Sequence, residues 1–205
     1  MILSKDVDTG IKYRVAVNEN TPPDALKILS KDVDVIIRHE VANNKNTPPD
    51  ILKTLSTDED KGIRYKVASN PNTPQDALKT LSTDESIITR FEVANNKNTP
   101  QDTLNTLSKD VSIDVRKRIA RNPNMPSDIL NTLSKDVSEY VRYGVVINPN
   151  APTDTLIQMY KDNKNDFNLQ STILYKLKDR NIDIENYLQE NKKRNIDKLL
   201  NFLIE

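Results

Sequence analysis

The sequence contains no cysteine, no net charge and no long apolar run among its 205 residues. Without cysteine, disulfides, thiolate metal sites and cysteine nucleophiles are excluded. Lysine plus arginine equals aspartate plus glutamate, at 30 each, so the chain has no overall field that attracts nucleic acid or an anionic membrane. No stretch approaches the roughly 20 apolar residues of a membrane span, and no signal peptide follows Met1. We therefore expect a cytoplasmic protein that needs no membrane, metal or cofactor.

The apolar residues are few but regularly placed, because the sequence repeats itself. The phrase VANNKNTPPDILKTLSTD, at 41–58, returns 52 positions later as VANNKNTPQDTLNTLSKD, at 93–110. Intermediate copies begin at Val15 and Val67, so the basic period is 26 residues. Six units begin at Leu3, Leu29, Leu55, Leu81, Leu107 and Leu133. A period of this length is typical of a solenoid, in which each unit buries its apolar side against its neighbours.

The first helical segment of each unit is predicted to open at the motif TPPD or its variants. A threonine is the expected N-cap, followed by proline in the first turn and an acid three residues after the threonine. These threonines are Thr21, Thr47, Thr73 and Thr99. Met125 and Ala151 replace threonine in the last two copies, so we expect those helix starts to be frayed by about 1 kcal/mol.

The second helical segment is predicted to start near an aspartate that recurs in every unit, as at Asp32 and Asp58. It carries an apolar pair at i and i+4, such as Ile37 with Val41, which predicts a buried stripe. Pairs of asparagines follow this segment, as at Asn44 and Asn46, and we expect them to stack as a ladder that satisfies loop amides.

The stretch IRYKVASNPNTPQDALKTLSTD, at 63–84, resembles the leucine-rich repeat variant family, and the resemblance covers residues 3–158. It implies a right-handed superhelix with α-helices in one layer and short or 3₁₀ helices in the other. Two departures are clear: the unit is longer than is usual in the family, and the chain has no cysteine for the iron–sulfur module that some members carry. The resemblance supplies a fold and little biochemistry.

The predicted architecture is an all-α, right-handed superhelical solenoid. Residues 1–158 are expected to form an array of six two-helix repeats, and residues 159–205 a C-terminal helical cap. The alternative for residues 159–205 is a dimerisation or partner helix. Within the cap, Asp166 or Asn168 is expected to start a helix, and amphipathic segments follow, the last with Leu199, Leu200 and Phe202. The N-terminal face of the array has no predicted cap, so we expect either that the chain is part of something longer or that this face docks onto a partner or a second copy.

One column of the second segment places aromatic residues away from the buried stripe. We predict that it binds a protein or peptide, with Ile36, Ile88 and Tyr140 extending the patch. The alternative interpretation is that these rings cover the grooves between adjacent helices. The predicted partner-binding residues are Tyr13, His39, Tyr65, Phe91 and Tyr143.

A basic column runs beside it, for example Arg38, Arg64 and Arg90, with Lys12 at its start. Its members either bind a polyanion or pair with the recurring aspartates of their own or the adjacent unit, and equal numbers at equal spacing favour pairing. A second column alternates in sign, and we expect its charges to pair with their neighbours along the array: Arg14, Glu40, Lys66, Glu92 and Arg118. The segment RKRIAR supplies a candidate nucleic-acid site: Arg116, Lys117, Arg118 and Arg121.

No catalytic or metal site is predicted. His39, the single histidine, has no companion nucleophile or paired carboxylate, and the DVD and DED motifs lack the remaining ligands of a calcium loop. The leading hypothesis is a non-enzymatic scaffold that binds a protein or peptide along one face. The alternative is a solenoid that binds nucleic acid through its stacked arginine columns, with affinity that falls steeply with salt.

Overall fold

The computed structural model describes residues 8–189, and within that range the chain is helical without any β-strand. It forms two compact units that divide between Met125 and Pro126. An all-helical repeat is therefore confirmed. No helix among these residues is long and apolar enough to cross a membrane.

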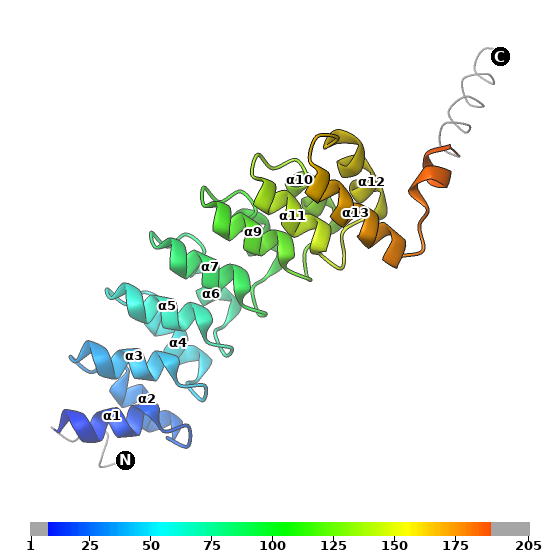
Figure 1. Cartoon of the computed structure of the whole chain (residues 1–205). Coiled ribbons are helices and arrows are strands. Elements are labelled where there is room, and N and C mark those ends of the chain that lie inside the picture. Colours follow the sequence, from blue (N-terminus) through cyan, green and yellow to red (C-terminus); the bar gives the residue numbers. More distant parts are fainter. Residues whose placement is uncertain (1–7, 190–205) are drawn as a thin grey trace, which may run out of the picture. The chain divides into compact units, whose positions relative to one another are not determined.

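The first unit, over residues 8–125, alternates long and short helices. The long helices have nine residues each and contact one another in series: α1 (Thr9–Val17), α3 (Val35–Asn43), α5 (Lys61–Ser69), α7 (Ile87–Asn95) and α9 (Ile113–Arg121). The short helices have seven residues each: α2 (Pro23–Leu29), α4 (Pro49–Leu55), α6 (Gln75–Leu81) and α8 (Gln101–Leu107). Figure 1 shows α1, α3, α5, α7 and α9 side by side as one layer, with α2, α4 and α6 behind them.

The core between the layers comes from the predicted apolar stripes. Ile37 and Val41 on α3 are fully buried, as are their counterparts on α5 and α9. Leu52 and Leu55 on α4 face them and are also buried. The alanine after each i+4 residue, such as Ala42, is buried as well, so its small side chain lies at the contact between neighbouring repeats.

The threonine of the TPPD motif does not cap the short helix, contrary to the prediction. Thr47 is buried, and its hydroxyl donates a hydrogen bond of 2.6 Å to the Val41 carbonyl. Pro48, in extended conformation, occupies the N-cap position of α4. The extended proline carries the chain forward, so the threonine side chain points back to the end of the preceding long helix.

The expected fraying where threonine is missing is also wrong. Helix α10 (Ser127–Leu133) follows Met125 and is seven residues long, as its counterparts are. Met125 itself is buried. Because the threonine made no cap, its replacement removes none.

The long helices start near the recurring aspartate, as predicted, and their first helical residue lies three positions after it. Asp34 is the N-cap of α3, and its carboxylate accepts the Ile36 amide at 2.9 Å. The recurring aspartate stands two residues earlier: Asp32 accepts the amide of Asp34 at 2.9 Å and so forms the turn before the helix. This turn delays the helix start.

The predicted asparagine ladder is confirmed. The side-chain amide of Asn70 donates to the Ala42 carbonyl at 2.8 Å and to the Asn44 carbonyl at 3.0 Å, both in the preceding repeat. Asn44 and Asn96 repeat the pattern one unit before and one unit after. Each also accepts the amide two residues ahead, which closes its own turn. The loops of adjacent repeats are thus joined through buried, fully satisfied amides.

The second unit continues the repeat with α10 and α11 (Glu139–Ile147), then departs from it. Helix α12 (Thr153–Asp162) is longer than the other short helices, and α13 (Phe167–Asp179) packs against both α11 and α12. Asp166 starts α13 by accepting the Leu169 amide at 3.0 Å. Residues 184–189 are helical, and the predicted segment with Leu199, Leu200 and Phe202 lies outside the described residues.

Candidate partner-binding face of the long helices

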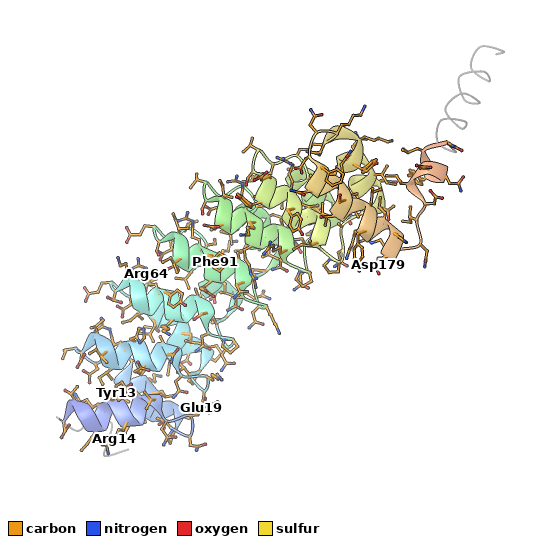
Figure 2. The ribbon with its side chains drawn as sticks, in the orientation of Figure 1. Tyr13, Arg14, Glu19, Arg64, Phe91 and Asp179 are labelled. Atoms are coloured by element: carbon orange, nitrogen blue, oxygen red, sulfur yellow. The ribbon has the colours of Figure 1, made fainter. Side chains whose placement is uncertain are left out.

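The long helices of the first unit expose one side to solvent, opposite their buried stripe. We call this side the outer face, and it comprises the following residues: Gly10, Tyr13, Arg14, Ile36, His39, Glu40, Gly62, Tyr65, Lys66, Ile88, Phe91, Glu92, Asn95, Asp114, Lys117, Arg118 and Arg121. Figure 2 shows Tyr13 on α1 and Phe91 on α7, at the two ends of four consecutive long helices. Because these helices contact one another in series, the structure brings Tyr13, His39, Tyr65 and Phe91 onto one surface.

The aromatic side chains are less exposed than the aliphatic ones beside them. Tyr65 and Phe91 are half-buried, while Ile36 is 54% and Ile88 64% exposed. The Lys66 ammonium lies 5.6 Å from the Tyr65 ring centroid. The Arg118 guanidinium of α9 lies 6.0 Å from the Phe91 ring of α7. Phe91 therefore lies against the neighbouring helix α9, and Ile36 and Ile88 are the more exposed apolar side chains.

These isoleucines alternate with glycines along the outer face. Gly10 and Gly62 occupy the position in α1 and α5 that Ile36 and Ile88 occupy in α3 and α7. The surface therefore repeats every 52 residues, although the backbone repeats every 26. The outer face therefore carries an exposed isoleucine on α3 and on α7, and none at the equivalent position of α5.

The expected charge ladder does not form. Among residues 8–189, no ion pair joins the alternating charges of neighbouring long helices. Glu40 instead lies beside His39, with 3.3 Å between its Oε1 and the imidazole Nδ1. Arg118 donates to the side-chain oxygen of Asn95 on α7. Glu40 and Arg118 thus each contact a partner outside the alternating column.

The basic column is confirmed in its structural interpretation. Arg38 donates to both carboxylate oxygens of Asp58 in the next repeat, at 2.8 and 3.1 Å, and Arg64 (labelled in Figure 2) does the same with Asp84. The side chains of Arg38 and Arg64 are only 12% and 13% exposed. Arg116 also donates into its own turn, to the Asp110 carbonyl at 2.7 Å. These guanidinium groups hold the backbone and the adjacent repeat.

Burial is the largest single influence on the pKa of Asp58, and by itself it favours the neutral acid. The hydrogen bonds from Arg38 and from the Asp60 amide, with the positive charges of Arg38 and Arg64, outweigh it and lower the pKa below its ordinary value. The carboxylate is therefore ionised when the pair forms.

The rest of the RKRIAR cluster lies on the outer face rather than in the turns. Arg118 and Arg121, together with Lys117 and Asp114 of α9 and Phe91 of α7, line a depression of about 120 Å³. This depression combines an aromatic ring, three cations and one carboxylate. The sequence predicted its basic residues but not the contribution of Phe91 or the contact with Asn95, which require knowledge of the register between helices.

Tyr143, the remaining predicted residue, belongs to the second unit. It lies on α11 and is 39% exposed, next to Tyr140, which is 61% exposed. Its neighbour Arg142 donates to the Asp136 carbonyl at 2.9 Å, as Arg116 does in its own repeat.

No family model and no curated protein matches this sequence. Among solved structures, a leucine-rich repeat variant described as having a novel repetitive structural motif aligns with 86% of this chain and 70% of its own. The identity is 25% and the TM-score 0.66. The chain has the leucine-rich repeat variant fold. An engineered protein, whose crystal structure covers 86% of this chain, has 14% identity and a TM-score of 0.33, too low to support an argument.

The leucine-rich repeat variant fold places long α-helices in one layer and short helices in the other, as the sequence resemblance implied. It makes this chain a helical-repeat scaffold. Within residues 8–189, no group of three or more histidine, aspartate or glutamate side chains could hold a metal ion.

Proposed function

We propose that this repeat scaffold binds a protein or peptide segment across its outer face. The observation that carries the proposal is the exposure of Ile36 and Ile88, at 54% and 64%, on alternate helices beside half-buried aromatic rings. Apolar side chains gathered on one surface and surrounded by polar residues are typical of interaction sites.

The spacing of the two isoleucines suits an extended ligand. Packed helices lie about 8–10 Å apart, so Ile36 and Ile88 are separated by about 16–20 Å across α5. An extended chain rises about 3.3 Å per residue and covers that distance in about five or six residues.

The proposed role is non-enzymatic. His39, on the outer face, contacts Glu40. Among residues 8–189, no nucleophilic side chain is hydrogen-bonded to this histidine. Nucleic-acid binding through the arginine column has less support. Arg38, Arg64 and Arg90 already donate hydrogen bonds to aspartate carboxylates and to carbonyls of the turns.

Affinity capture from a lysate of the source cells tests the proposal, with the double variant Ile36→Ser, Ile88→Ser compared with the wild type. The matched control is Val33→Ser, Val111→Ser, because these valines are 97% and 89% exposed in turns outside the helices. We expect a discrete protein, resistant to nuclease, that the wild type and the control retain and the isoleucine variant loses. A partner retained equally by all three, or lost on nuclease treatment, would contradict the proposal.

A further inference from the structure

The depression between α7 and α9 has a composition unlike the rest of the outer face. Its lining residues Lys117, Arg118 and Arg121 outnumber the single carboxylate of Asp114. Elsewhere on the outer face, helices α3 and α7 each present one glutamate, Glu40 and Glu92. The strongest local charge on the outer face is therefore positive and lies at α9.

The two arginines of this depression are not committed to carboxylates. Neither Arg118 nor Arg121 is in an ion pair with a described carboxylate, in contrast to Arg38, Arg64 and Arg90. Arg118 stacks near the Phe91 ring and donates one N–H to the Asn95 side chain. A guanidinium held in this way is pre-organised, and its remaining donors match the geometry of a carboxylate.

We infer that this depression takes the carboxylate side chain of a glutamate or aspartate in the bound segment, so that the partner is an acidic segment interspersed with aliphatic residues. The inference rests on the proposed function and names the chemistry of its ligand. The carboxylate pairs with Arg118 and Arg121, and the neighbouring aliphatic side chains of the segment pack on Phe91 and Ile88.

The size of the depression favours a side chain over a nucleotide. At about 120 Å³ it is well below the roughly 300–1,000 Å³ of sites that enclose a small molecule. Asp114 lines it and Glu92 lies on the adjacent helix, so a continuous phosphate backbone would meet negative charge on both sides. A single carboxylate fits between them.

A second hollow continues the path of the segment. It measures about 300 Å³, and its lining includes Ser69, Pro71, Glu92 and Asn95. Asn95 is the residue that Arg118 contacts, so the two hollows lie on either side of that contact. The carboxylate of Glu92 and the amide oxygen of Asn95 can accept backbone N–H groups of a segment that continues from the depression over α7 toward α5.

The test is an NMR titration of the full chain with two peptide probes, one repeating Glu-Leu-Ser and one repeating Gln-Leu-Ser. We expect the acidic peptide to shift the side-chain Nε–H signals of Arg118 and Arg121 and to bind about tenfold more tightly than the neutral one. The variant Arg118→Gln, Arg121→Gln should abolish this difference. The variant Lys27→Gln, Lys31→Gln removes the same charge from exposed positions at and beside α2 and should preserve it.

The outcomes separate this inference from the proposed function. Equal binding of both peptides, with shifts at Ile36 and Ile88, would overturn the inference and leave the proposed function standing. Any other result in which the acidic peptide binds no more tightly than the neutral one would also overturn the inference. Tighter binding of an oligothymidylate than of the acidic peptide at Arg118 would replace it with a nucleic-acid site.

Discussion

The guanidinium of Arg90 grips the carboxylate of Asp110 in the following repeat, with Nε–Oδ2 and Nη2–Oδ1 distances of 2.6 and 3.0 Å. Their side chains are only 11% and 6% exposed. The third nitrogen of Arg90 donates to the Asp84 carbonyl of its own repeat at 2.8 Å. One side chain therefore fixes the turn before its own helix and the turn of the next unit.

Replacing Arg90 with alanine should destabilise the fold by about 3 kcal/mol, because Asp110 keeps its charge but loses its partner. Urea unfolding monitored by circular dichroism measures the change. The matched control is Lys79→Ala, which removes the exposed pair with Asp102, where the side chains are 69% and 63% exposed. That change should cost less than about 1 kcal/mol. Equal losses in the two variants would contradict the proposed importance of burial.

The stability of the protein should fall in acid because of these same carboxylates. Burial, the largest influence on the pKa of Asp110, favours the acid form, but the hydrogen bonds from Arg90 and the Ser112 amide and the charges of Arg90 and Arg116 outweigh it. The folded-state pKa is thus lower than the roughly 3.9 of an unfolded aspartate. The stabilisation is complete above that unfolded value and disappears as the pH falls through the folded-state pKa.

Urea unfolding at a series of pH values tests this dependence. We expect the stabilising contribution of these groups to stay nearly constant between about pH 7 and 5 and to be lost progressively below about pH 4. The Arg90→Ala variant should lose less over the acid range, because one lowered pKa has been removed. A larger acid loss in the variant would contradict the assignment.

Replacing a single asparagine of the ladder should lower the stability of the fold. The change Asn70→Ala removes both donors to the Ala42 and Asn44 carbonyls, and we expect a loss of about 2–3 kcal/mol. Asn43→Ala, at an exposed position of α3, is the control and should change stability by less than about 0.5 kcal/mol. Thermal unfolding distinguishes the two, and a mild effect of Asn70→Ala would indicate that water replaces the rung.

The end of α13 depends on a residue in the left-handed region. Asn181 has φ of 58°, while the Asn181 and Ile182 amides donate to the Lys178 and Leu177 carbonyls at 2.9 Å. We expect Asn181→Gly to be neutral or slightly stabilising and Asn181→Val to destabilise the second unit by about 1–2 kcal/mol. Hydrogen exchange of the α13 amides measures both changes, and equal protection in the two variants would contradict the assignment.

Arg180, beside it, was not anticipated from the sequence. It donates to the Ala151 and Pro149 carbonyls at 2.7 and 3.0 Å. Asn98 makes the equivalent contact to Pro71 in the first unit, at 2.6 Å. After the asparagines end, the arginine that caps the C-terminus of α13 makes part of their contacts. No periodicity could reveal this, because Arg180 lies outside the repeat.

The sequence predicted the period, the buried stripes and the pairing of the basic column because each depends on contacts that recur with every repeat. It failed at Thr47, where the capping motif is locally plausible but the extended Pro48 turns the hydroxyl toward the preceding helix. It also failed for Arg118, whose contacts with Phe91 and Asn95 depend on the register of adjacent helices. Local patterns cannot choose between two nearby partners of similar chemistry.

Photo-crosslinking in the source cells tests the central claim most directly. A benzoylphenylalanine replaces Tyr65 on the outer face of α5 in one variant and Thr80, exposed on the short helix α6, in the other. The proposed function predicts a discrete protein adduct from position 65 and none from position 80. An adduct from position 80 alone would place the binding surface on the short helices and contradict the account.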